Sequence, residues 1–233
     1  EVVDATGKML LPSWCDSHTH LVYAGNREEE FKDRINGLSY EEIASKGGGI
    51  LNSAKTLQTT SAESLYQQSK VRLEEVMRLG TGALEIKSGY GLTPEAELKM
   101  LRVIKRLQEE TSIPIKATFL AAHALPEAFK SNKMGFLRNM LNEVLPVLIA
   151  EDLASAIDVF CEMGYFSPED TAEILQAAQA YGLVPKIHVN QFNAIGGVAV
   201  GVQFNARSVD HLEILTDADV AVLQGSKTMP VAL

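Results

Sequence analysis

The sequence predicts an α/β fold, a (β/α)8 barrel of the TIM type that is truncated to about seven strands. Strand-like apolar segments alternate with helix-like segments along the whole chain, which favours parallel strands joined by helical crossovers. No low-complexity stretch or internal linker divides the 233 residues. A closed barrel needs eight strands with their helices and typically about 250 residues, so we expect an incomplete barrel.

The predicted strands are short apolar segments bounded by turn residues. Their ranges are 11–22, 82–88, 113–121, 156–162, 184–190, 207–211 and 227–232. A doubly wound open sheet is the alternative arrangement of such elements. The sequence has no Gly-x-Gly-x-x-Gly motif after a strand, and this weakens the alternative.

Helical patterns lie between these strands, most clearly at 61–79, 94–111, 135–150, 168–181 and 216–224. Leu65, Val71 (with its neighbours Leu73 and Val76) and Leu79 give the first of them an apolar stripe at roughly helical spacing. Ser167 and Pro168 predict the start of another helix, with serine as the N-cap and proline at the first helical position.

Composition and charge favour a small-molecule substrate. The net charge of −9 repels nucleic acids and anionic membrane surfaces, and no apolar run approaches 18 residues. We therefore expect neither nucleic acid nor membrane as a partner. Cys15 and Cys161 do not indicate a disulfide framework, and no signal peptide is visible, so we expect a cytoplasmic protein.

The five histidines all fall at or just beyond the carboxyl ends of predicted strands. They are His18, His20, His123, His188 and His211. In a barrel, active sites lie at this face, so the distribution predicts a site there.

His18 and His20 stand two residues apart, and on a strand this spacing points both side chains to the same face. Two neutral imidazoles on one face suit Zn²⁺ or Fe²⁺. His188 could supply a third ligand from across the barrel. The alternative for His18 and His20 is a polar strand end with exposed histidines. The alternative for His188 is a buried histidine whose hydrogen bonds are satisfied.

Other polar residues follow the strands. His123 and His211 could orient a substrate or move protons near neutral pH, or could be structural. Arg27 could clamp a substrate carboxylate, although a solvated surface arginine fits its position equally well. Tyr90 is flanked by glycines that permit close approach to a ligand, and Glu162 could be buried and paired.

With these residues in place, the sequence resembles the imidazolonepropionases, a family of the amidohydrolase superfamily. The resemblance runs along nearly the whole chain. Its stretches are Asp16-Ser-His-Thr-His-Leu-Val-Tyr-Ala-Gly-Asn-Arg27, Arg34-Ile-Asn-Gly-Leu-Ser-Tyr-Glu-Glu-Ile-Ala44, Glu85-Ile-Lys-Ser-Gly-Tyr-Gly-Leu92, Ala122-His-Ala-Leu-Pro126, Asp158-Val-Phe-Cys-Glu162, Lys186-Ile-His188 and Val209-Asp-His-Leu-Glu213.

The resemblance implies a barrel of the amidohydrolase kind and a small β-sandwich domain that is missing here. Residues 1–10 would be a linker from that domain, and 11–233 the hydrolase barrel, incomplete at its C-terminus. The family's fourth metal ligand, an aspartate of the eighth strand, lies beyond this chain. The implied assembly is a homodimer.

The resemblance also implies the site and its reaction. One divalent Zn or Fe ion would be held by His18, His20 and His188, and the substrate site would be drawn from Arg27, Tyr40, Tyr90, His123 and His211. The family often has glutamate where this chain has Gln191, which can hydrogen-bond but cannot act as a general base.

The implied reaction is hydrolysis of the cyclic amide bond of 4-imidazolone-5-propanoate to N-formimino-L-glutamate, a step of histidine degradation. Arg27 with Tyr40 would anchor the propionate, Tyr90 and His123 would hold the ring, and His211 would assist the chemistry, with Gln191 in an open role. The alternatives are another amidohydrolase, such as a cyclic-amide hydrolase or heterocycle aminohydrolase, and an inactive fragment.

Overall fold

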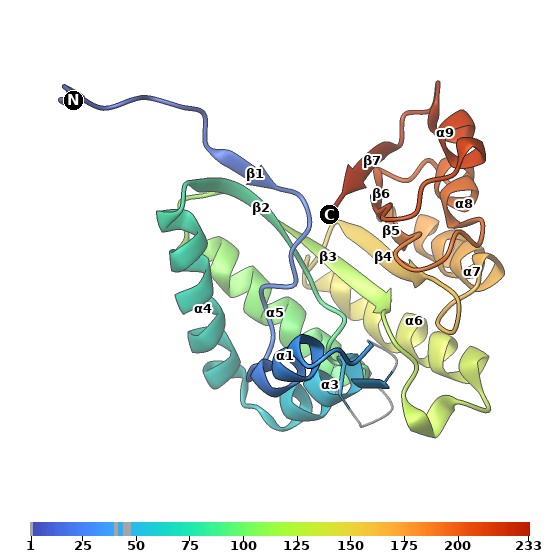
Figure 1. Cartoon of the computed structure of the whole chain (residues 1–233). Helices are drawn as coiled ribbons and strands as arrows, with labels where there is room; N and C mark the ends of the chain where they lie inside the picture. The colour runs from blue at the N-terminus through green and yellow to red at the C-terminus, as the bar shows by residue number, and fades with distance from the viewer. Residues whose placement is uncertain (1, 40–41, 44–47) are drawn as a thin grey trace.

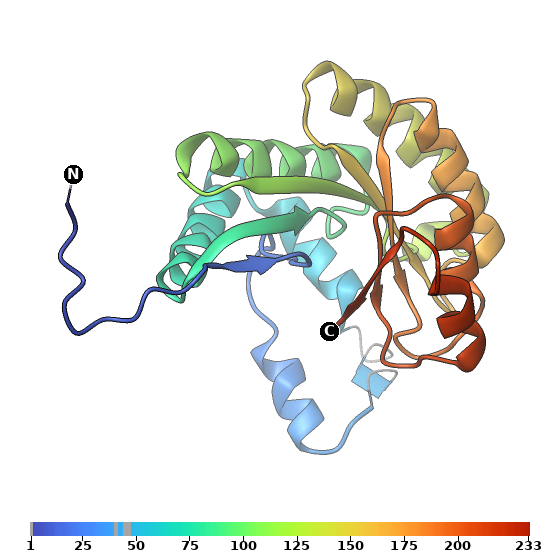
Figure 2. The same ribbon diagram turned by 90° about the horizontal axis from the view of Figure 1, so that it is seen from above.

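Seven parallel strands form one curled sheet in the computed structural model, which describes residues 2–39, 42–43 and 48–233. The strands lie side by side in chain order, each hydrogen-bonded to the next, and the helices cover the outside of the curl (Figures 1 and 2). They are β1 (Trp14–Asp16), β2 (Thr81–Lys87), β3 (Ile115–Ala122), β4 (Ala156–Cys161), β5 (Val184–Val189), β6 (Ser208–His211) and β7 (Met229–Ala232). The prediction of a truncated (β/α) barrel is confirmed.

The strand at the N-terminal end is shorter than the sequence predicted. The apolar stretch 11–22 suggested a long strand, whereas only three residues of β1 pair with β2, with a register shift after Trp14. Within the described residues, β1 and β7 each pair with one neighbour only, and a cavity of about 400 Å³ lies between them. The division into a linker at 1–10 and a barrel at 11–233 stays a prediction.

The helices between the strands include all five that the sequence predicted. Their bounds are α1 (Glu28–Ile35), α3 (Ile50–Thr59), α4 (Ala62–Arg78), α5 (Pro94–Glu110), the 3-10 turn η1 (Glu127–Phe129), α6 (Lys133–Ala150), α7 (Pro168–Gln179), α8 (Gly197–Gln203) and α9 (Asp217–Leu223). The prediction missed three of the described helices: α1, which buries no residue, α3, and α8, whose sequence Gly-Val-Ala-Val-Gly-Val-Gln lacks a polar face.

Local sequence signals explain two helices in different ways. Ser167 caps α7 through a capping box with Asp170, as the Ser-Pro start predicted. On α4 the predicted stripe is partly wrong. Leu65 and Leu73 are buried, but Val71 and Leu79 are 61% and 78% exposed, because the buried face of this helix runs through Leu65, Tyr66, Ser69 and Leu73.

The core lies between the sheet and its helices. Phe119 of β3 and Val159 of β4 are fully buried, and Met100 and Ile104 of α5 pack in the same cluster. Strands covered on both faces read as continuous apolar runs, which is why charged residues inside them stand out. None of the described helices combines the length and apolarity that crossing a membrane requires.

Candidate metal centre and substrate site

All five histidines gather at the carboxyl-end face of the curled sheet, as the sequence predicted. His18 and His20 follow β1, His123 follows β3, His188 lies in β5, and His211 ends β6. The ring centroids of His18 and His188 are 4.5 Å apart, those of His20 and His123 are 5.1 Å apart, and those of His188 and His211 are 5.2 Å apart. Residues from four strand ends thus form one cluster.

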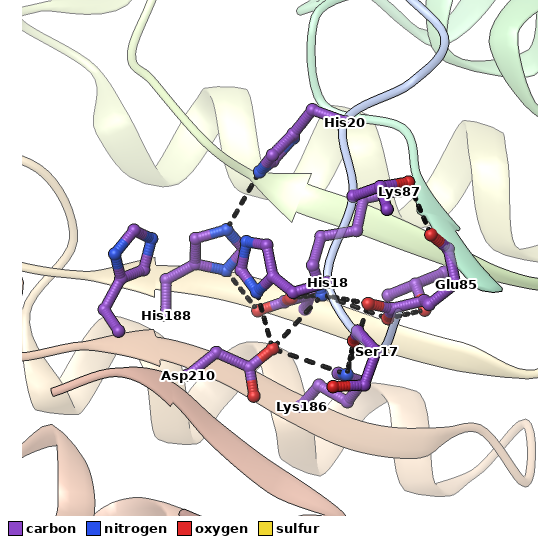
Figure 3. A network of polar contacts seen from close by, with 12 residues as sticks. Ser17, His18, His20, Glu85, Lys87, Lys186, His188 and Asp210 are labelled. Carbon is purple, nitrogen blue, oxygen red and sulfur yellow. Dashed lines mark hydrogen bonds and ion pairs between the residues drawn. The ribbon is translucent and has the colours of Figure 1, made fainter. Parts of the chain in front are cut away.

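Three of these histidines form a group that can hold a metal ion. His18, His20 and His188 each offer a ring nitrogen, and these atoms lie within 4.8 Å of one another. The Nε2 atoms of His20 and His188 are 3.3 Å apart and face each other (Figure 3). The buried Nδ1 atom of His20 has no hydrogen-bond partner among the described residues.

Two buried carboxylates fix the orientation of two of these rings. Asp210 Oδ2 lies 2.7 Å from His18 Nδ1, and Asp158 Oδ1 lies 3.0 Å from His188 Nδ1. A carboxylate at Nδ1 holds the proton there and leaves the Nε2 lone pair for a metal, an arrangement common around metal-binding histidines. Asp158 and Asp210 were not among the residues that the sequence singled out for the site.

Burial favours the neutral form of His188 and His20. It lowers the pKa of His188 to about 4, against the opposing effect of Asp158. It also lowers the pKa of His20 well below its ordinary value, and the neighbouring His123 and His188 add to this effect. Neutral imidazole is the form that binds metals, so the donor set fits a divalent ion such as Zn²⁺ or Fe²⁺.

A buried network of charges lies beneath the histidines (Figure 3). The Lys87 ammonium contacts Glu85 at 2.8 Å, Asp158 at 2.7 Å and Asp210 at 3.6 Å. Lys186 contacts Glu85 at 3.2 Å and Asp210 at 3.4 Å. The two lysines therefore bridge the carboxylates that orient His18 and His188.

The pKa shifts of Lys87, Asp158 and Asp210 favour the charged form of each. Burial lowers the pKa of Lys87, but Asp158, Glu85 and Asp210 outweigh it and raise that pKa above its ordinary value. Burial likewise raises the pKa of Asp158, but His188 and Lys87 hold it well below its usual range. The pKa of Asp210 falls to about 2, since the hydrogen bond from His18 and the charge of Lys87 exceed the effect of burial. The sequence signal that could have revealed this network is a pair of charged residues, such as Glu85 and Lys87, that stand two apart in a buried strand.

A cavity of about 270 Å³ opens beside His20. Its lining residues are His20, Tyr23, Asn26, Arg27, Ser53 and Tyr90. The predicted substrate residues Arg27 and Tyr90 thus share a cavity wall with a residue of the histidine group. The Arg27 guanidinium also donates to Glu30 at 2.6 Å, which ties it to α1.

His123 lies inside the same cluster and is held by the backbone. Its Nδ1 atom is 3.0 Å from the carbonyl oxygen of Gly89, and its ring centroid is 5.1 Å from that of Tyr90. Burial and the proximity of His188 lower the pKa of His123 to about 3, although the Gly89 hydrogen bond opposes them. The ring is therefore neutral.

The remaining predicted residues differ in their placement. His211 Nδ1 contacts Glu213 Oε1 at 3.0 Å, and His211 has a φ of +92°, a strained backbone typical of functional sites. Gln191 is half-buried in the bend after β5, and its side chain makes no hydrogen bond with the described residues. Glu162 accepts from the backbone of Phe192 and Asn193, a loop-holding role. Tyr40 lies outside the described residues.

Comparison with known proteins finds curated relatives of the chain. Over its full length the chain is 64% identical to the curated imidazolonepropionase of Christiangramia forsetii, of which it covers 57%. Over 97% of its length it is 44% identical to that of Shewanella baltica, of which it covers 56%. The chain is a homologue of imidazolonepropionase. It spans a little more than half the length of these curated imidazolonepropionases.

A solved structure supports the fold. The 5-methylcytosine deaminase of Klebsiella pneumoniae matches 98% of the chain with a TM-score of 0.71, at 14% identity and over 55% of that deaminase. At this identity the likeness concerns the fold alone. No family model matches the chain.

Proposed function

We propose that the native polypeptide containing this chain hydrolyses the cyclic amide bond of 4-imidazolone-5-propanoate to N-formimino-L-glutamate. One observation carries the proposal. His20 belongs both to the three-histidine group and to the wall of the cavity that holds Arg27 and Tyr90. A substrate carboxylate at Arg27 would thus place its ring beside the metal ligands.

Arg27 and Tyr40 anchor the propionate in this proposal. The planar guanidinium of Arg27 can bind a carboxylate through two parallel hydrogen bonds, which fixes the direction of the substrate. Tyr90 and His123 hold the imidazolone ring, since their rings are 5.1 Å apart and both face His20.

The histidines His18, His20 and His188 bind the metal ion in this proposal. A divalent ion in such a site supplies an activated water at neutral pH. The water oxygen bonds to the ring carbonyl carbon, the carbon–nitrogen bond breaks, and the ring nitrogen gains a proton. His211 stabilises the negative charge that develops on the carbonyl oxygen or passes the proton, and Gln191 contributes hydrogen bonds only.

Several finer properties belong to the same proposal. The metal is zinc or iron, because three imidazole ligands suit both. The polypeptide works as a homodimer in the cytoplasm, in a pathway of histidine breakdown. The donor set supports the metal, and the 64% identity to an imidazolonepropionase supports the pathway.

The test is loss of the absorbance of 4-imidazolone-5-propanoate with the native polypeptide, before and after chelation and metal add-back. The proposal expects turnover that chelation abolishes and that Zn²⁺ or Fe²⁺ restores. Bound metal without turnover would refute this substrate. Turnover that survives complete metal removal would refute the role of the three histidines.

A further inference from the structure

The loop between β2 and α5 presents two groups to the candidate site. It carries the Tyr90 ring, which lines the cavity, and the Gly89 carbonyl, which contacts His123 Nδ1 at 3.0 Å. Displacement of this loop would therefore move Tyr90 and release His123 together. The contacts that hold this loop therefore also fix the positions of Tyr90 and His123 in the candidate site.

One buried carboxylate accepts hydrogen bonds from three residues of this loop. Glu97, at 0% exposure on α5, accepts hydrogen bonds from the backbone N–H of Gly89 at 2.8 Å, Gly91 at 2.6 Å and Leu92 at 3.0 Å. Its Oε2 atom takes the Gly89 bond, and its Oε1 atom takes the other two. All three donors lie within eight residues of Glu97 in the sequence.

The backbone around this carboxylate is shaped for contact with it. A Cβ atom on Gly91 would lie 2.4 Å from the backbone nitrogen of Glu97, so only glycine allows the loop to rest on the helix. Gly89 has a φ of +107°, and a Cβ atom there would lie 2.7 Å from the Leu120 side chain. Leu92 has a φ of +55°, which is uncommon outside glycine. A strained loop of this kind persists only when its surroundings hold it.

We infer that Glu97 is a positioning residue for the substrate site, acting through Gly89 on His123 and through Gly89 and Gly91 on Tyr90. Glu97 touches none of the three candidate metal ligands in the contacts of the described residues. Its effect should thus fall on substrate binding and on His123, and leave metal binding in place. The kinetic part of this inference rests on the proposed function.

Glu97→Gln is the informative change. Glutamine keeps the shape of the side chain but turns one acceptor oxygen into an NH₂ group, so either orientation leaves at least one loop N–H unpaired. In the native polypeptide we expect KM for 4-imidazolone-5-propanoate to rise about tenfold, with kcat changed less and metal content unchanged. By ¹⁵N NMR, the Nδ1–H proton of His123 should exchange with solvent faster.

The matched control is Glu95→Gln. Glu95 is exposed, lies in the same first turn of α5, and loses the same charge near the same helix N-terminus. KM and His123 exchange should not change in this variant. Equal effects of the two substitutions would show that only helix charge matters and would overturn the inference.

The inference can still be tested if Glu97→Gln does not fold or if the unsubstituted protein shows no turnover. If Glu97→Gln fails to fold, Gly91→Ala should give the same rise in KM and the same His123 signature, because its Cβ would lie 2.4 Å from the backbone nitrogen and 2.8 Å from Oε1 of Glu97 and so would push the loop off the carboxylate. An unchanged His123 signal in a folded Glu97→Gln protein would refute the inference. If the unsubstituted protein does not turn over the substrate, the proposed function fails, and the NMR comparison still decides the role of Glu97.

Discussion

Oδ1 of Asp158 lies 3.0 Å from Nδ1 of His188, while Oδ2 of the same carboxylate accepts a hydrogen bond from Lys87 at 2.7 Å. Asp158 thus joins a candidate metal ligand to the buried charge network. Asp158→Asn should lower metal affinity about 10- to 100-fold, since the amide no longer holds the proton of His188 at Nδ1. Competition with a chromophoric chelator measures this affinity. The exposed Asp152→Asn is the control, and equal affinities in the two variants would argue against the orienting role.

Lys87 is the cation on which three buried carboxylates depend. Lys87→Met keeps the length of the stem but removes the lysine partner of Asp158 and leaves Glu85 and Asp210 with Lys186 alone. We expect a loss of about 3–5 kcal/mol in the free energy of unfolding, measured with urea in the absence of metal. Lys32→Met, which breaks an exposed ion pair with Glu29, should change it by less than about 1 kcal/mol. A small loss for Lys87→Met would mean that the carboxylates simply take up protons.

Arg27 should govern substrate affinity. Arg27→Ala removes a charge-assisted contact, so KM for 4-imidazolone-5-propanoate should rise about 10- to 100-fold with kcat less affected. Initial-rate kinetics on the native polypeptide give both constants. Arg34→Ala, an exposed arginine of the same helix region, should leave KM unchanged. An unchanged KM in Arg27→Ala would remove Arg27 from the substrate site.

His123 should make the metal-free protein sensitive to acid. The folded ring stays neutral down to a pKa of about 3, whereas an unfolded histidine takes up a proton near pH 6.5. The unfolded state therefore binds more protons between these values, and stability falls as the pH drops. The contribution of this one group is about 1.4 kcal/mol per pH unit, fully present above pH 6.5.

Urea unfolding of the metal-free protein at a series of pH values tests this slope. The stability curve of His123→Asn should be flatter than that of the unsubstituted protein between pH 6 and 4, by about 1.4 kcal/mol per pH unit. Parallel curves would mean that His123 is already protonated in the folded state.

The fold was largely predictable because its signals are local. Alternating strand and helix patterns are repeated along the chain, and capping at Ser167 needs only four residues. The helix α1 escaped prediction because its eight residues bury nothing, and its two apolar residues, Phe31 and Ile35, are exposed. The strand β1 was overestimated because pairing with β2, and not the length of the apolar run, sets its ends.

The histidines of the candidate site were predictable from the sequence, but the residues that orient them were not. Five histidines at strand ends form a pattern visible in the sequence. The bond from His188 to Asp158, thirty residues away, depends on the register of β4 against β5, which no local pattern fixes. Glu97 was also missed, because a glutamate in the first turn of a helix reads as an ordinary surface residue until its burial is known.

Isotope incorporation tests the central proposal most directly. The native polypeptide, loaded with Zn²⁺ or Fe²⁺, is incubated with 4-imidazolone-5-propanoate in H₂¹⁸O, and the product is analysed by mass spectrometry. The account predicts N-formimino-L-glutamate with one ¹⁸O in the carboxylate derived from the ring carbonyl, and none after chelation. Absence of this product with metal bound, or its undiminished formation by metal-free protein, would contradict it.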